Sequence, residues 1–132
     1  MNLDLLEERL EYSFGDRSIL LQSLTHTSFG HEFLQDLAPG LRDNERLEFL
    51  GDAVLDVVIS DILLELFPLA REGQLSKMRA AVVNEKTLAV VARSIDLPEV
   101  LRLGKGESMT GGHQKPSILS STFEALIAAI YL

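Results

Sequence analysis

Residues 43–67 restrict the possible folds most strongly, because they have helical spacing but no broad polar face. At about 100° per residue, apolar side chains occupy most of the helical wheel. They are Leu47, Leu50, Val54, Leu55, Val57, Val58, Ile62 and Leu63. A helix that is apolar nearly all round is buried in a core or at an interface. The sequence therefore predicts a long helix with partners on several sides.

Most polar side chains of this helix are acids, and four of them form a narrow acidic stripe. Its members share a sector of about 80°: Glu45, Glu48, Asp52 and Asp56. Like charges at these spacings repel one another, so the stripe is destabilising unless something compensates it. Gly51 costs about 1 kcal/mol relative to alanine inside a helix. Its presence predicts close packing by another helix or backbone segment.

Glu124 is a second acidic position, since it is the only charged residue between Ser117 and Leu132. Spacing alone leaves two interpretations open. The stripe is either a solvated strip with Arg46 or other bases as counterions, or part of a metal site that Glu124 completes. Oxygen ligands, without cysteine and with only three histidines in the chain, favour Mg²⁺ or Mn²⁺ over zinc. Such ions are typical of phosphoryl-transfer sites.

Length and composition limit the class of protein. The 132 residues suffice for one domain with its own core. The sequence contains no cysteine, no apolar run long enough to cross a membrane and no recognisable signal peptide, so we expect a cytoplasmic protein. Twenty acids and twelve bases give a net charge of −8. This charge disfavours nucleic-acid binding unless bound divalent cations offset the carboxylates.

Helical periodicity continues through the chain and predicts an all-α domain. The expected helices cover residues 2–12, 16–24, 28–37, 43–67, 74–94, 96–101 and 117–132. The glycine-rich stretch 103–117 is expected to be the one long loop. The last helical pattern reaches Leu132 without a stop signal, which is typical either of a fragment cut from a longer protein or of a frayed end.

The segment NERLEFLGDAVL, residues 44–55, resembles the signature of the ribonuclease III family of double-stranded-RNA endonucleases. Four more segments resemble family motifs in the same order: residues 24–29 (LTHTSF), 72–93, 101–107 (LRLGKGE) and 117–132 (SILSSTFEALIAAIYL). The resemblance covers residues 1–132 as one nuclease domain. It implies an all-helical homodimer that cuts duplex RNA to 5′-phosphate and 3′-hydroxyl ends, in processing of rRNA, mRNA and tRNA precursors. Family members often add a C-terminal double-stranded-RNA-binding domain, which these residues do not include.

The resemblance also implies roles for individual residues. The implied metal ligands are Glu48, Asp52 and Glu124. Asp52 and Glu124 are also the expected catalytic residues. Glu45 and Glu72 match acids that line the family's RNA-binding valley, and Phe49 matches an apolar residue of the dimer interface. The expected cofactor is Mg²⁺, with Mn²⁺ able to substitute; no small-molecule cofactor and no membrane partner are expected.

Ser121 departs from the family pattern, in which an aspartate stands three residues before the glutamate of the last motif. Its neutral hydroxyl is a weaker ligand for a hard dication than a carboxylate. Three outcomes stay open: weakened catalysis, compensation by a water or by an acid such as Asp56, or an inactive module that binds duplex RNA without cutting it.

Other polar residues receive smaller roles. His26 lies between two threonines, and we expect it to be a hydrogen-bonded packing residue rather than a catalytic base. Lys105, His113 and Lys115 are the basic residues expected to contact RNA, because duplex RNA is recognised mainly through its shape, phosphates and 2′-hydroxyls.

Overall fold

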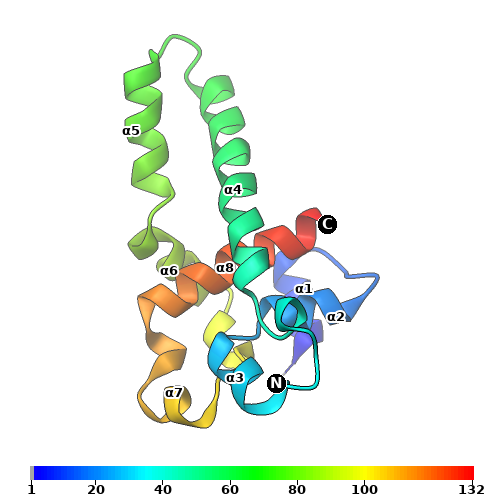
Figure 1. The fold of residues 1–132 in the computed structure, drawn as a ribbon. Helices are drawn as coiled ribbons and strands as arrows, with labels where there is room; N and C mark the ends of the chain where they lie inside the picture. Colours follow the sequence, from blue (N-terminus) through cyan, green and yellow to red (C-terminus); the bar gives the residue numbers. More distant parts are fainter. Residues whose placement is uncertain (1) are drawn as a thin grey trace.

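The computed structural model describes residues 2–132, and in that range it contains helices and turns but no strand. The α-helices are α1 (Leu3–Leu10), α2 (Arg17–Ser23), α3 (Thr27–Phe33), α4 (Glu45–Leu66), α5 (Glu72–Val82), α6 (Glu85–Ser94), α7 (Lys105–Met109) and α8 (Pro116–Tyr131). The 3-10 segments are η1 (Pro39–Leu41), η2 (Leu97–Val100) and η3 (Gly112–Gln114). None of these helices combines the length and the apolar character that a membrane span requires. The predicted all-α fold is confirmed (Figure 1).

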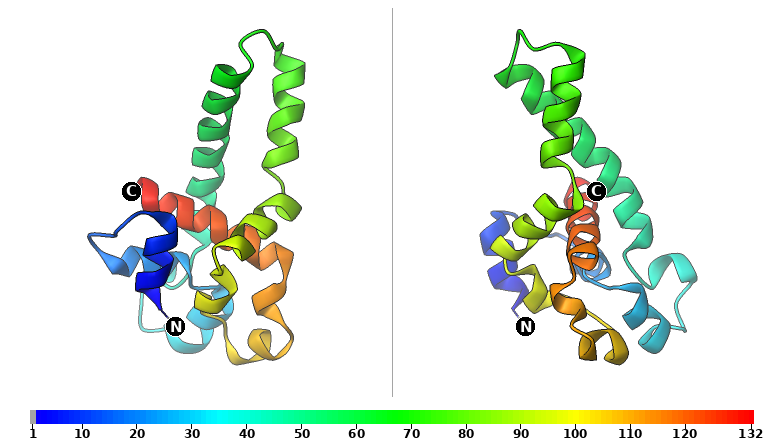
Figure 2. Two further views of the ribbon diagram at one scale, coloured as in Figure 1. Left: turned by 180° about the vertical axis from the view of Figure 1, so that it is seen from behind. Right: turned by 90° about the vertical axis from the view of Figure 1, so that its left-hand side faces the viewer.

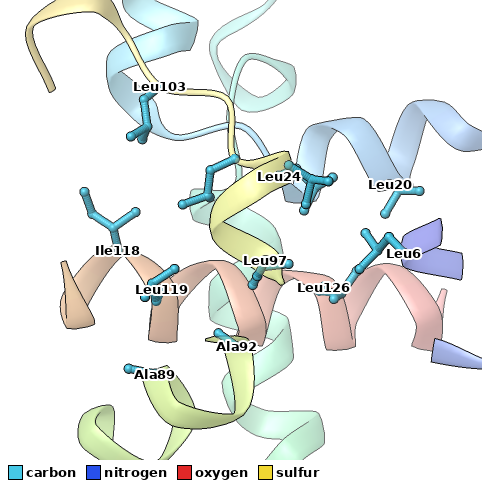
Figure 3. Packing of buried hydrophobic residues seen from close by; sticks show 12 residues of the cluster. Leu6, Leu20, Leu24, Ala89, Ala92, Leu97, Leu103, Ile118, Leu119 and Leu126 are labelled. Carbon is cyan, nitrogen blue, oxygen red and sulfur yellow. The ribbon is translucent and has the colours of Figure 1, made fainter. Parts of the chain in front are cut away.

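α8 forms the centre of the fold and packs against α2, α4 and α6 (Figures 1 and 2). Pro116 begins this helix at a position where its missing N–H removes no helical hydrogen bond. The helix buries side chains on several faces, as its nearly uncharged sequence requires. Figure 3 shows Leu119 and Leu126 of α8 among core leucines from α1, α2 and η2.

The predicted helix over residues 74–94 is wrong, because the chain breaks into α5 and α6 at Val83 and Asn84. Asn84 has an extended backbone, and its side chain accepts a hydrogen bond from the Thr87 N–H at 2.9 Å. This contact caps the start of α6. A good capping residue therefore overrides a continuous apolar period.

Three shorter predictions also need correction. The helix expected over residues 28–37 ends at Phe33, and the one expected over 96–101 is the 3-10 segment η2. η2 follows Asp96, whose φ of 56° is incompatible with a regular helix. The stretch 103–117 is not one irregular loop, since it contains α7 and η3. Helical periodicity cannot resolve segments of only one or two turns.

α4 and α5 form a hairpin that projects from the rest of the fold (Figures 1 and 2). α5 buries no residue, and beyond Leu55 α4 buries only Leu63. The exposed apolar side chains on this half of α4, named here the hairpin surface, are Val57, Val58, Ile62, Leu64 and Leu66. The prediction was that α4 is buried in a core or at an interface, and a single chain tests only the first of these. Only the first half of α4 finds partners there.

Candidate metal centre

The first half of α4 crosses α8 in direct backbone contact. A Cβ atom added to Gly51 would lie 1.7 Å from the carbonyl oxygen of Glu124, so only glycine fits at the crossing. The close contact predicted from Gly51 is confirmed, and its partner is the backbone of the second acidic position. Asp52 follows Gly51 directly, and its carboxyl lies close enough to that of Glu124 to raise the pKa of Glu124. The crossing thus brings together two acids that are far apart in the sequence.

An open cavity of about 1170 Å³ lies beside this crossing. Its acidic lining residues are Glu45, Glu48, Asp52 and Glu124. The rest of its wall is mostly apolar and comes from α2, α4, the η1 segment and Leu132. This space is named the acidic cavity below. Two helices therefore collect at one place four of the acids that the sequence singles out.

The carboxylates of the acidic cavity lack basic partners. Among residues 2–132, no ion pair reaches the acidic stripe or Glu124, although Arg46 lines the same cavity. Burial, the nearby Asp52 carboxyl and the other neighbouring negative charges raise the pKa of Glu124 to about 8. At neutral pH most Glu124 side chains therefore carry a proton. Because no ion pair reaches these acids within residues 2–132, the interpretation with basic counterions is not supported.

Helix geometry explains only part of this cluster. Glu45 and Glu48 lie in the first turn of α4, where the helix N-terminus stabilises an acid by about 0.3–1 kcal/mol. Asp52 lies further along α4 and Glu124 lies in the middle of α8, beyond the reach of that effect. Neither position gains from the helix dipole, so these two acids need another reason to be adjacent.

The acidic residues that line the cavity suit a hard divalent cation, because each of them offers carboxylate oxygens as ligands. Within residues 2–132, no three acidic or histidine side chains are already arranged as ligands of one ion. A bound cation would therefore draw these side chains closer together and displace the proton from Glu124. The residue types fit such an ion, and the side chains have to move to hold it.

Ser121 lies one helical turn before Glu124 on α8. Its hydroxyl donates a hydrogen bond to Oε1 of Glu48 at 3.1 Å. Asp56, the other acid considered as a substitute for the missing aspartate, does not line the acidic cavity. Its negative charge nevertheless contributes to the raised pKa of Glu124.

Two further residues were singled out by resemblance, and the structure places them differently. Glu72 lies at the start of α5, where it accepts a hydrogen bond from Ser76 at 2.9 Å. It lines a separate depression between α4 and α5, together with Ser60 and Arg79. Phe49 borders the acidic cavity, but 84% of its surface is exposed. Within one chain, Glu72 is remote from the cavity and Phe49 is left mostly uncovered.

The structural role expected for His26 is confirmed. Its Nδ1 accepts a hydrogen bond from the Ser28 N–H at 3.2 Å, which caps α3, and burial lowers its pKa. Of the basic residues expected to contact RNA, Lys115 forms an ion pair with Glu107 at 2.5 Å. That contact partly neutralises one of the three candidate cations.

Two polar residues that hold the start of α4 in place were not found from the sequence. Asn44 is buried, and its amide donates to the Ser23 carbonyl at 3.0 Å and to Thr122 Oγ1 at 3.4 Å. It thereby joins α2 and α8 to the start of α4. Gln22 donates at 3.1 Å to each of two carbonyl oxygens in the segment before α4. An asparagine before a helix is a visible capping signal, but here its side chain bonds elsewhere, and no sequence signal marks Gln22.

The fold and the cavity define a class of protein: an all-helical domain in which two crossing helices carry acids into one open cavity. A family model described as ribonuclease-III-like matches residues 16–132. The chain belongs to the ribonuclease-III-like family, as the resemblance of its motifs indicates.

Individual relatives agree with this assignment. Ribonuclease 3 of Pseudomonas fluorescens is 52% identical to all of this chain, which covers 53% of that relative. Ribonuclease 3 of Actinobacillus pleuropneumoniae is 49% identical, with 55% of its length covered. A solved structure of the nuclease domain of ribonuclease III from Campylobacter jejuni is also similar, with a TM-score of 0.89 and 45% sequence identity. The match covers 98% of this chain and 85% of the solved one. That structure is described as flexible in a region involved in dimer formation. The chain spans about half the length of the curated relatives it matches.

Proposed function

We propose that this domain is a Mg²⁺-dependent endonuclease of double-stranded RNA. The observation that carries the proposal is the acidic cavity, where Glu48, Asp52 and Glu124 meet from two helices without a basic partner. Membership of the ribonuclease-III-like family supports the same reaction. The proposal includes products with 5′-phosphate and 3′-hydroxyl ends and substrates among rRNA, mRNA and tRNA precursors.

The acids of the cavity have different proposed roles. Glu48, Asp52 and Glu124 would hold the metal, and Mg²⁺ or Mn²⁺, when bound, supplies charge stabilisation for phosphoryl transfer. Glu124 gives up its proton when a cation binds, so metal affinity should rise with pH up to about 8. Glu45 lines the same cavity and strengthens the negative potential that concentrates divalent cations there.

We further propose that the domain acts as a homodimer. Phe49 is 84% exposed beside the acidic cavity, and the hairpin surface adds five exposed apolar residues on the same helix. Exposed apolar patches of this kind mark interaction surfaces, and burial against a second copy would cover them. The Campylobacter jejuni domain, which this chain resembles closely, has a region involved in dimer formation. Glu72 could serve a cavity only in such an assembly, since it is remote from the one in its own chain.

Cleavage of a long duplex RNA in Mg²⁺ tests this function. Glu124→Gln keeps the size of the side chain but removes a ligand charge, and should slow cleavage at least about 100-fold. The matched control is Glu65→Gln, which removes one charge from the exposed end of α4 and should cleave like the unaltered domain. Equal cleavage by the two variants would exclude the proposed site.

A module that binds duplex RNA without cutting it is a second candidate, favoured by Ser121 at the position of the family's aspartate. In that case the unaltered domain retains duplex RNA in a mobility-shift assay but does not cut it in Mg²⁺. Ser121→Asp should then switch cleavage on. Rapid cleavage by the unaltered domain excludes this candidate.

A further inference from the structure

Ser120 and Ser121 are adjacent on α8 but use their hydroxyls differently. Ser120 is buried and donates to the Ser117 carbonyl of its own helix at 3.2 Å. Ser121 is partly exposed and donates across the helix crossing to Oε1 of Glu48, at 3.1 Å. The first contact is local to α8, whereas the second joins α8 to α4 beside the acidic cavity.

The bond from Ser121 constrains a side chain that is otherwise free to move. Glutamate has three rotatable side-chain bonds, and ordering such a chain carries an entropy cost. Within residues 2–132, Glu48 forms no ion pair, and its side chain has no other hydrogen bond. Ser121 is thus the one polar contact that holds this carboxylate, and it occupies only one of the two oxygens.

An aspartate at position 121 would act in the opposite way. Its carboxylate could only accept hydrogen bonds, so it would repel Glu48 at close range unless a cation lay between them. A serine donates a hydrogen bond to Glu48 instead, and it leaves the cluster with one negative charge fewer than an aspartate would. Ser121 therefore differs from the family's aspartate in two ways: it donates a hydrogen bond to Glu48, and it is a weaker metal ligand.

We propose that Ser121 is a positioning residue: it stays off the metal and orients Glu48 as a ligand by donating a hydrogen bond to one of its oxygens. This role rests on the proposed function, because it requires the acidic cavity to bind a divalent cation. Groups that bond to metal ligands in this way fix the ligand's orientation, and their removal typically lowers metal affinity about 10- to 100-fold.

Calorimetric titration of the metal-free domain with Mn²⁺ at pH 8 tests the role directly, without RNA. Ser121→Ala removes the donor and should weaken Mn²⁺ binding about 10-fold. Ser121→Thr keeps a hydroxyl at the same atom and should bind within about threefold of the unaltered domain. Ser120→Ala is the matched control, because it removes a hydroxyl one position away that bonds only within α8. It should leave Mn²⁺ binding unchanged.

Glu48→Ala separates the failure of this inference from the failure of the proposed function. If Glu48→Ala abolishes Mn²⁺ binding while Ser121→Ala binds as tightly as the unaltered domain, the positioning role is wrong and the metal centre stands. If the unaltered domain binds no Mn²⁺, both are wrong. Equal losses in Ser120→Ala and Ser121→Ala would also overturn the role, since they would indicate a general disturbance of α8.

A double-mutant cycle on unfolding of the metal-free domain gives a second check. Ser121→Ala should lower the unfolding midpoint slightly, and this decrease should vanish in the Glu48→Ala background, because the bond then has no acceptor. The same decrease in both backgrounds would overturn the inference.

Discussion

The two halves of α4 have similar apolar content but opposite surroundings. Residues 45–55 lie against α8 and bury Leu47, Gly51 and Leu55, whereas residues 56–66 lie in the projecting hairpin and bury only Leu63. An apolar helical pattern indicates that the side chains pack against another surface. The pattern does not indicate whether that surface belongs to the same chain. The first half finds its partner in α8, and the second half presents the hairpin surface.

The difference extends to the acids. Three acids of the stripe line the acidic cavity, and all of them belong to the half that is fixed against α8: Glu45, Glu48 and Asp52. Metal ligands have to be held in a defined geometry, and a helix anchored by close packing provides it better than a projecting hairpin. The candidate site therefore lies on the half of α4 that packs against α8, and the hairpin surface lies on the half that projects from the rest of the fold.

The largest expected effect on stability comes from replacing a glycine of α4 with alanine, and the same replacement in α5 is the comparison. Gly51→Ala should destabilise the domain by at least about 3 kcal/mol, because the added methyl would overlap the Glu124 backbone at 1.7 Å. Gly73→Ala, on α5, meets no atom within 4 Å and should stabilise the domain by about 0.5–1 kcal/mol. Urea unfolding of both variants measures the difference. Equal stability would mean that α4 and α8 do not touch at Gly51.

The sequence predicted the helical class, the close contact at Gly51 and the acids of the cavity, because each depends on a local property. Charge, glycine and apolar spacing can all be read without knowing the fold. The break at Asn84 was missed because a single capping side chain competed with a longer apolar pattern. Gln22 and Asn44 were missed because their partners are brought close only by the packing of α2 and α8 around the start of α4.

Phe49 is the exception within the packed half of α4, and its substitution tests the proposed dimer. Phe49→Ser should weaken self-association by about 2 kcal/mol or more, roughly 30-fold in dissociation constant. The stability of the single chain should change little, since the ring is 84% exposed. Sedimentation equilibrium measures the association.

The matched control for Phe49 is Met109→Ser on α7, at the end of the molecule opposite the hairpin (Figure 1). Met109 is 83% exposed, so the two variants remove apolar side chains of similar accessibility. Only Phe49→Ser should shift the equilibrium toward monomer. If Met109→Ser dissociates the protein equally, the interface does not lie beside the acidic cavity.

The smallest expected effect on stability concerns the proton on Glu124, at the crossing of α8 with the first half of α4. Between pH 4.5 and about 8 the unfolded chain has lost this proton while the folded chain keeps it, so Glu124 lowers stability progressively as pH rises through that interval. Glu124→Gln should therefore match the unaltered, metal-free domain near pH 4.5 and exceed its stability by roughly 1–2 kcal/mol at pH 8. The gain is modest because the carboxyl is partly exposed to solvent.

Urea unfolding in a chelator at several pH values measures this difference, with Glu65→Gln as the control for lost charge. Excess Mg²⁺ should reverse its sign, since the unaltered domain then gains the free energy of metal binding and Glu124→Gln loses a ligand. A stability difference that does not change with pH would contradict the raised pKa of Glu124. A difference that changes with pH but not with Mg²⁺ would support the raised pKa of Glu124 and contradict cation binding in the acidic cavity.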